Sequence, residues 1–208
     1  SALRFHGNLV DTNAALDSLT ISTLLPESTV LTVTVTAHDA RYRYLPSTGH
    51  FYRQMSASRI RYFDAANAAP SLTVKSRPGY LVTVTNDAEF NLLLALMTPS
   101  DALWIGLSDD GSEGNWWWWS GPESGATTTY TRWCSGQPNG NWLFDQDYVF
   151  FSGSASGACW TDSESFSIDI DGYLVEFGDS TPFTDFFSAT MPISVVAPTA
   201  TPTATATA

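Results

Sequence analysis

The sequence predicts an α+β domain in which two helices precede a loop-rich region of antiparallel strands. Two segments with helical character, 56–69 and 87–97, lie on either side of a short apolar strand at 79–85. From residue 106 to 157 the chain is dense in Gly, Ser, Pro and Asn, which favour turns and long loops. We therefore expect one α+β domain over residues 41–179.

Local sequence accounts for each element of this domain. "GHFYRQM" at 49–55 is typical of a strand, and a helix at 56–69 would place Ile60 and Phe63 on one side. Asn86 is a good N-cap for the second helix, because its side-chain oxygen can accept hydrogen bonds from the first turn.

The two ends of the chain differ from the middle. Residues 28–39 alternate branched apolar residues with Thr, which is typical of a half-buried strand. With the strand and helical turn upstream, residues 5–39 resemble the C-terminal half of a cadherin-like or immunoglobulin-like repeat of a large surface adhesin. We expect a partial β-sandwich repeat over 1–40.

Residues 180–208 are expected to hold a strand-like segment and then a linker. "APTATPTATATA" at 197–208 contains only Ala, Pro and Thr, so it offers nothing to bury and predicts an extended stalk. Its threonines are candidate sites of O-glycosylation, and an unmodified flexible linker is the alternative.

Charge and hydropathy exclude several classes of partner. The formal net charge is -12, and the nine Lys and Arg residues form no cluster in the sequence, which speaks against nucleic acid. The longest apolar run, at 91–97, is too short to span a bilayer. We expect an acidic protein with no membrane span in this segment.

The sequence shows no catalytic constellation. His6, His38 and His50 are scattered, and no Ser/His/Asp or Cys/His arrangement follows from their spacing. His50 falls on the first predicted strand, where a packed or surface role is expected. We expect that the protein is not an enzyme.

Six landmarks in the middle of the chain occur in a recognisable order. They are "GHFYR" from 49, "GYLVTVTNDAEFNLLL" from 79, "WIGLSDDGSEGNWWWWSG" from 104, "QPNG" from 137, "CWTD" from 159 and "GYLVEFG" from 172. Together they resemble a C-type lectin-like domain over residues 48–178. The resemblance implies two helices, antiparallel strands with long loops, and an extracellular or cell-surface location.

The two cysteines, Cys134 and Cys159, are compatible by spacing with a disulfide or with two separate thiols. The resemblance places them in neighbouring regions and so implies a disulfide that pins the long loop. Closing a loop of this length would stabilise the fold by roughly 3 kcal/mol.

Calcium is the cofactor that the resemblance implies. The sugar-binding site of the family would fall on Gln137, Asn139, Gln146, Thr161 and Asp162, where only Asp162 is charged. Since calcium prefers several oxygen ligands with negative charge, this set predicts weak binding.

A second, more structural ion site would fall on Asp109, Glu113 and Asp147, and Asp145 offers a partial substitute for Gln146. Asp162 completes the candidate metal ligands. The alternative for each acid is a solvated loop residue or a cap for backbone N–H groups.

The four consecutive tryptophans at 116–119 cannot share one role, because neighbours on a strand point to opposite faces. The resemblance places Trp116 and Trp118 in the core, near Trp104. Trp117 then remains as the candidate contact for a sugar or a neighbouring domain, and Trp119 is expected to be partly buried.

Two functions follow from these features. The first is a structural or interaction module of a large extracellular protein or filament, which packs on neighbouring domains and assembles into a fibre. The alternative is a carbohydrate-binding adhesin domain, calcium-dependent or not. Its candidate glycan contacts are Trp117, Gln137, Asn139, Trp142 and Asp162.

Overall fold

A computed structural model describes most of the chain, which divides into two compact units: Ala40–Thr184, and Ser1–Asp39 together with Asp185–Ala208. The described residues are 31–36, 41–140, 145–153, 157–167, 169–183 and 188–193. Within them, no helix has the length and hydropathy that crossing a membrane requires.

The smaller unit contains one described strand pair. β1 (Leu31–Thr36) and β11 (Ser188–Ile193) run antiparallel, with Leu31 opposite Ile193 and Thr36 opposite Ser188. β1 lies within the segment 28–39, and the stalk at 197–208 lies outside the described residues. Two strands from the two ends of the chain thus pair with each other.

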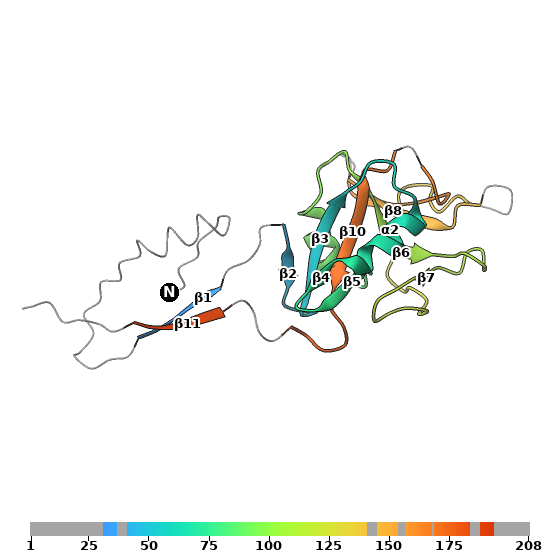
Figure 1. The fold of residues 1–208 in the computed structure, drawn as a ribbon. Coiled ribbons are helices and arrows are strands. Elements are labelled where there is room, and N and C mark those ends of the chain that lie inside the picture. Colours follow the sequence, from blue (N-terminus) through green and yellow to red (C-terminus); the bar gives the residue numbers. More distant parts are fainter. Residues whose placement is uncertain are drawn as a thin grey trace, which may run out of the picture. The chain divides into compact units, whose positions relative to one another are not determined.

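The larger unit is built on a mostly antiparallel sheet in the order β2-β3-β10-β6-β8-β9 (Figure 1). β10 is central: it pairs antiparallel with β3 and parallel with β6, and β5 also pairs with it. β4 pairs with β5, and β7 pairs with β6. The strands are β2 (Arg43–Leu45), β3 (His50–Ser56), β4 (Thr73–Val74), β5 (Arg77–Leu81), β6 (Ala102–Ser108), β7 (Trp117–Trp118), β8 (Tyr148–Ser152), β9 (Cys159–Ser163) and β10 (Gly172–Phe177).

Two α-helices and a 3-10 turn complete this unit, which confirms the predicted α+β class. The helices are α2 (Tyr62–Ala68) and α3 (Asp87–Leu94), and the 3-10 turn η1 spans Ala69–Ser71. The cap of α3 is as predicted, since Asn86 Oδ1 accepts hydrogen bonds from Ala88 N at 2.9 Å and from Glu89 N at 3.1 Å.

The first helix is shorter than predicted, and its buried face differs. Residues 57–60 form a turn instead of helix: Ile60 N donates to Ala57 O, and Arg59 has a φ of 62°. Ala57 N and Arg59 N donate to the carbonyls of Asp171 and Ile170, which holds this turn in place. The helix therefore begins six residues later than the predicted 56, at Tyr62.

The later start changes which side chains of the helix are buried. Tyr62 and Ala65 are buried, whereas Phe63 is 39% exposed. Ile60, predicted to share a side of the helix with Phe63, precedes the helix, because backbone pairing with the segment before β10 outweighed local helical propensity.

The main core lies on one face of β6. Leu103, Ile105 and Leu107 point into it, and Trp104, between them, points to the other face, because side chains alternate along a strand. The remaining buried members of this cluster are Tyr52, Val82, Val84, Phe90, Leu93, Trp116, Trp118, Val149, Phe151, Trp160 and Leu174. Trp104, expected near Trp116 and Trp118, instead makes ring contacts with Tyr62 and Phe150.

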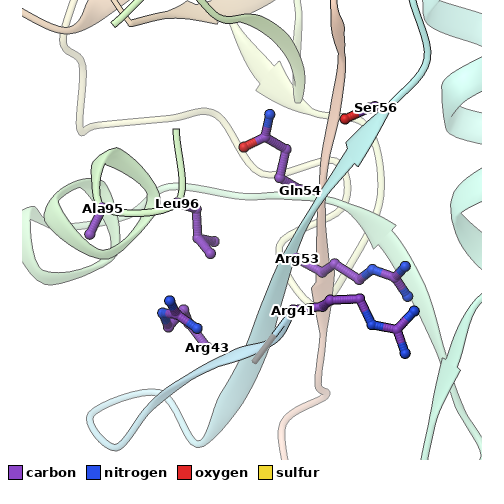
Figure 2. Close-up of a pocket in the computed structure, with 7 residues that line it drawn as sticks. All are labelled: Arg41, Arg43, Arg53, Gln54, Ser56, Ala95 and Leu96. Atoms are coloured by element: carbon purple, nitrogen blue, oxygen red, sulfur yellow. The ribbon is translucent and has the colours of Figure 1, made fainter. Parts of the chain in front are cut away.

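The edge of the sheet formed by β2 and β3 carries a groove of about 360 Å³ next to the end of α3 (Figure 2). Seven residues line it: Arg41, Arg43, Arg53, Gln54, Ser56, Ala95 and Leu96.

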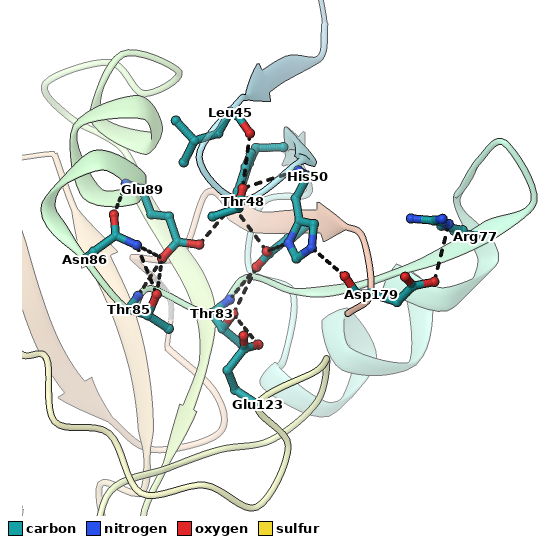
Figure 3. A network of polar contacts seen from close by, with 12 residues as sticks. Leu45, Thr48, His50, Arg77, Thr83, Thr85, Asn86, Glu89, Glu123 and Asp179 are labelled. Carbon is teal, nitrogen blue, oxygen red and sulfur yellow. Dashed lines mark hydrogen bonds and ion pairs between the residues drawn. The ribbon is translucent and has the colours of Figure 1, made fainter. Parts of the chain in front are cut away.

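A buried polar network joins β3, β10 and α3 (Figure 3). His50 Nδ1 lies 2.6 Å from Glu176 Oε1, and Glu176 Oε2 accepts from Thr83 N at 3.0 Å. Tyr52 donates its hydroxyl to Glu89 Oε1 at 2.9 Å. Burial raises the pKa of Glu176, which is 1% exposed, so these partners compensate for a costly buried carboxylate.

Candidate functional site

A disulfide fixes the long loop against β9. Cys134 and Cys159 are bonded, with Cα atoms 4.9 Å apart, so the disulfide is confirmed. Cys134 N also donates to Trp160 O at 2.9 Å, and Trp160 N donates to Arg132 O at 2.7 Å. The backbone just before residue 137 is therefore held beside the start of β9.

The loop at 137–140 wraps around one carboxylate of β9. Asp162 Oδ2 accepts hydrogen bonds from Asn139 N at 2.9 Å and from Gly140 N at 2.7 Å. The peptide bond between Gln137 and Pro138 is cis. A Cβ atom on Gly140 would lie 3.1 Å from Asp162 Oδ2, so glycine allows the close approach.

Two oxygen atoms at this loop are buried without a hydrogen bond. Gln137 Oε1 and Asp162 Oδ1 accept none from the part of the chain that the structure describes, although Asp162 is only 2% exposed. Leaving a buried acceptor without a partner costs about 1–3 kcal/mol. A cation or a ligand hydroxyl that binds here would remove this cost.

The other predicted ligands of this site are placed differently. Thr161 points to the opposite face of β9 from Asp162, and its hydroxyl donates to Cys134 Sγ at 3.3 Å. Gln146 is half-buried, and its Cβ lies close to Gly140. Asn139 meets Asp162 through its backbone N–H.

A second cluster of carboxylates lies where the loop enters β8. Oxygen atoms of Glu113, Asp145 and Asp147 lie within 4.8 Å of one another. Two of these, Glu113 and Asp147, belong to the predicted structural ion site, and Asp145 was predicted only as a substitute for Gln146. Asp109 accepts a hydrogen bond from Gly114 N at 2.7 Å, and its other oxygen, Oδ1, is buried without a partner among the described residues.

The charges of this cluster oppose one another. Burial and then the charges of Asp145 and Asp109 raise the pKa of Asp147 to about 7. Burial, together with the charges of Glu113 and Asp162, raises the pKa of Asp109 to about 6. The grouped carboxylates of Glu113, Asp145 and Asp147 fit a hard divalent cation, which would neutralise the repulsion between them and with Asp109.

The donor sets of the two places differ in how well they fit calcium. The cluster of Glu113, Asp145 and Asp147, which lies near Asp109, offers only carboxylate oxygens, as calcium prefers. The loop site offers one carboxylate, Asp162, and neutral oxygens, so it fits the ion less well.

The four tryptophans separate onto two faces of β7. Trp116 and Trp118 are buried, as predicted, and contact Trp133 and Trp160. Trp117 is half-buried and stacks on the equally half-buried Trp119, with ring centroids 5.3 Å apart and planes at 25°.

One partner of this aromatic face was missed from the sequence. Phe63 lies 5.7 Å from Trp119, ring to ring, and extends the exposed aromatic surface onto α2. The alternation of the tryptophans signals that Trp117 and Trp119 share a face, but nothing in the sequence pairs them with Phe63. Trp142, the other predicted aromatic contact, lies outside the described residues.

Comparisons with known proteins agree with this geometry. The family model described as "Lectin C-type domain" matches residues 73–162. The chain is 30% identical over 142 residues to Halomucin of Haloquadratum walsbyi, a match that covers 64% of this chain and 2% of that protein.

Two lectins are also similar. The chain is 30% identical over 96 residues to the Alpha-N-acetylgalactosamine-specific lectin of Patiria pectinifera, which covers 44% of this chain and 54% of the lectin. It is 35% identical over 95 residues to Lectin BRA-3 of Megabalanus rosa, covering 45% of this chain and 52% of the lectin. The chain thus spans about half the length of each of these two lectins.

Solved structures share the fold. The C-type lectin domain of murine dendritic cell inhibitory receptor 2 superposes with a TM-score of 0.54 at 18% identity, covering 67% of this chain and 98% of that one. The C-type lectin CEL-I from Cucumaria echinata gives 0.53 at 24% identity, covering 68% and 97%. The family match over residues 73–162 and the similarity to these solved structures show that the larger unit has the fold of C-type lectin domains.

Proposed function

We propose that this domain binds carbohydrate at the loop 137–140, beside Asp162. The observation that carries the proposal is the pair of buried oxygens without partners, Gln137 Oε1 and Asp162 Oδ1, next to the loop that wraps Asp162. Sugar hydroxyls, or an ion that they coordinate, would satisfy both atoms. Proteins with the C-type lectin fold are generally carbohydrate binders without enzymatic activity, which supports the same conclusion.

In this proposal, each residue of the loop makes a different kind of contact with the sugar. Asp162 supplies the negative charge, and Gln137 and Asn139 supply neutral polar groups for hydroxyls. Trp142 follows Gly140 by two residues in the sequence and is the aromatic ring that we propose stacks on the C–H face of the sugar. Trp117 serves a separate surface, because it points away from the face on which Trp118 meets Trp160.

In this proposal, calcium binds at the carboxylate cluster where the loop enters β8. We propose that the ion binds Glu113, Asp145 and Asp147, where it would neutralise charges that repel one another and the nearby Asp109, and would stiffen the loop that leads to Asp162. We expect the ion mainly to make the loop that leads to Asp162 rigid. Direct coordination of the sugar is expected to be a minor role, since the loop site holds a single charge.

The test is a glycan array followed by calorimetry on the hits, with the protein in calcium and in EDTA. Asp162→Asn is expected to abolish binding, because it removes the only charge of the site. The matched control is Asp64→Asn, which changes an exposed aspartate of α2 and should leave binding unchanged. Absence of any glycan hit in both conditions would contradict the proposal.

A structural role in a larger extracellular protein is the second candidate. The specific observation is that β1 and β11, from the two ends of the chain, pair with each other. An isolated two-stranded sheet is marginal in water, so we propose that further strands of a neighbouring β-sandwich repeat complete it. C-type lectin domains are generally extracellular or surface-exposed, which is consistent with such a surface protein or fibre.

That role has its own test. A protein extended at both ends by the parent sequence should protect the β1 and β11 amides from hydrogen exchange, whereas residues 41–183 alone should retain the lectin unit. If the extension leaves exchange in β1 and β11 unchanged, the proposed repeat is wrong.

A further inference from the structure

A buried histidine of β3 links β10 to the residues that follow it. His50 is 7% exposed, and both nitrogen atoms of its ring face hydrogen-bond acceptors. Nδ1 lies 2.6 Å from Glu176 Oε1, and Nε2 lies 2.9 Å from the backbone oxygen of Asp179 (Figure 3). A Cβ atom on Gly178 would lie 2.1 Å from His50 Cδ2, so glycine lets the ring lie directly against the backbone.

The two contacts of His50 require two protons. A backbone carbonyl can only accept a hydrogen bond, so Nε2 must carry a proton to bond Asp179. The short contact with Glu176 needs a second proton between Nδ1 and Oε1, because a nitrogen lone pair would repel the carboxylate oxygen. Either the imidazolium or a neutral Glu176 carries this second proton, and in both cases the two residues share it. The pair therefore holds one more proton than a neutral histidine and a carboxylate.

The surroundings of the pair favour keeping the shared proton. The Thr83 hydroxyl lies 3.0 Å from Glu123 Oε2 and 3.1 Å from Glu176 Oε2, but it has a single proton to donate. Burial alone would lower the pKa of His50. The hydrogen bonds to Glu176 and Asp179, with the charges of Glu176 and Glu123, outweigh burial and raise this pKa above its usual 6.5.

The other titratable groups next to the pair come from α3, β3 and β5. Glu89 of α3 accepts the hydroxyl of Tyr52, and burial raises the pKa of Tyr52 and Tyr80 further above 10, so both phenols stay protonated. Arg77 lies 3.4 Å from the side chain of Asp179 and contributes a fixed positive charge. The shared proton is thus the group of this network that changes near neutral pH.

Asp179 begins a segment, residues 179–183, that lies against the start of β3 and is called the return segment below. Phe183 N donates to Gly49 O at 3.1 Å, and the ring of Phe183 lies 5.1 Å from the ring of Phe51. The return segment is the last described part of the larger unit before β11. His50 therefore contacts the point at which the chain leaves β10 for the smaller unit.

Loss of the shared proton leaves one ring proton for two acceptors. The hydrogen bond to the carboxylate of Glu176 is the stronger of the two, because a charged acceptor roughly doubles the strength of a hydrogen bond. The remaining proton then lies on Nδ1, and Nε2 faces the carbonyl oxygen of Asp179 with a lone pair. The contact between His50 and the return segment is lost.

We propose that the proton shared by His50 and Glu176 holds the return segment against β3, and that its loss at higher pH releases this segment. An unfolded histidine releases its proton near pH 6.5, whereas the folded pair releases it at higher pH. The stabilisation is therefore complete below about pH 6.5 and is lost as pH rises through the folded pKa. Neither residue belongs to the loop 137–140 or to the carboxylate cluster, so this switch goes beyond the proposed function and is independent of it.

The experiment follows the full chain in EDTA by NMR from about pH 5 to about pH 9, the range in which histidine titrates. One signal is the ring Cε1–H of His50, which is identified by its absence in His50→Gln. The other is the protection of Phe183 N–H against hydrogen exchange, relative to its intrinsic rate. Gly153 N–H, which donates to Asp101 O at 2.8 Å, is the reference amide for changes in global stability.

The His50 signal should titrate with a midpoint above 6.5, and the protection of Phe183 N–H should fall about tenfold around the same midpoint. The protection of Gly153 N–H should fall less than about twofold. His50→Gln should remove the pH dependence at Phe183, and the matched control His38→Gln should keep it. Arg77→Gln removes a different contact of the return segment, so it should lower the protection of Phe183 at every pH.

Three results would overturn the proposal. They are a midpoint of His50 at or below 6.5, a protection of Phe183 N–H that stays constant through the titration, and an equal fall of protection at Gly153 N–H. The native protein alone gives all three readings, so the test stands even where His50→Gln does not fold.

Discussion

Replacement of Asp109 by Asn should stabilise the calcium-free protein at neutral pH. Asp109 is 2% exposed, and only its Oδ2 has a described hydrogen-bond partner, Gly114 N. Burial and the neighbouring charges raise its pKa from 3.8 to about 6. Asn keeps an oxygen for Gly114 N and carries no charge, so it removes the repulsion without removing this hydrogen bond.

The magnitude follows from linkage between protonation and folding. Because the pKa of Asp109 is higher in the folded state, the folded protein holds this proton more tightly, and stability is lost as pH rises from about 3.8 through about 6. The rise in the pKa of Asp109 from 3.8 to about 6 corresponds to a loss of about 3 kcal/mol in the free energy of unfolding above pH 7. Between pH 4.5 and pH 7.5 the Asn variant should therefore gain about 2 kcal/mol relative to the native protein.

Urea denaturation in EDTA at these two pH values measures the difference. Asp64→Asn serves as the control and should show no pH-dependent gain, because that side chain is exposed. In calcium the native protein should be more stable than the Asp109→Asn variant, since the ion stabilises the native protein more. A stability difference between Asp109→Asn and the native protein that is the same at both pH values would refute the reasoning.

Three further changes test the disulfide, a helix cap and the division of the tryptophans. Replacing Cys134 and Cys159 together by Ser should lower the free energy of unfolding by about 3.5 kcal/mol, from the 25-residue separation, as measured by urea denaturation with and without reductant. Asn86→Ala should cost about 1 kcal/mol, because two N–H groups of α3 lose their acceptor, and an Asn86→Ser variant should recover part of it. Trp116→Ala should lower the free energy of unfolding by about 3–5 kcal/mol, because Trp116 is in the core. Trp117→Ala should lower it by well under half of that, because Trp117 is only half-buried. Equal losses in thermal or urea unfolding would argue against two distinct faces.

Much of the fold could be predicted because its signals are local. The Asn86 cap, the helix after it and the strand at 49–55 each depend on a few adjacent residues, and all are present. The alternation of side chains on a strand likewise separates Trp116 and Trp118 from Trp117. The first helix was the exception, because hydrogen bonds to the distant Ile170 and Asp171 hold the residues before Tyr62 in a turn.

The candidate site could be located from the sequence but not assembled. The motifs identified Gln137, Asp162 and the two cysteines. The spacing of these residues does not show that Gln137 Oε1 and Asp162 Oδ1 lack hydrogen bonds, or that the Thr161 hydroxyl donates to Cys134. Asp145 joins the carboxylate cluster because of how the loop enters β8, and spacing does not give the path of that loop.

The α+β class, the helix after Asn86 and the separation of Trp117 from Trp116 and Trp118 follow from the sequence, because periodicity, caps and turn residues act within a few positions. Which charged side chains lie close together depends on the tertiary structure. Asp109 and Asp147 are thirty-eight positions apart, yet Asp109 N donates to Asp147 O, and the charge of Asp109 contributes to the raised pKa of Asp147. Charge contacts between distant residues depend on the folded path of the chain, and so the sequence could not show that Asp145 joins Glu113 and Asp147.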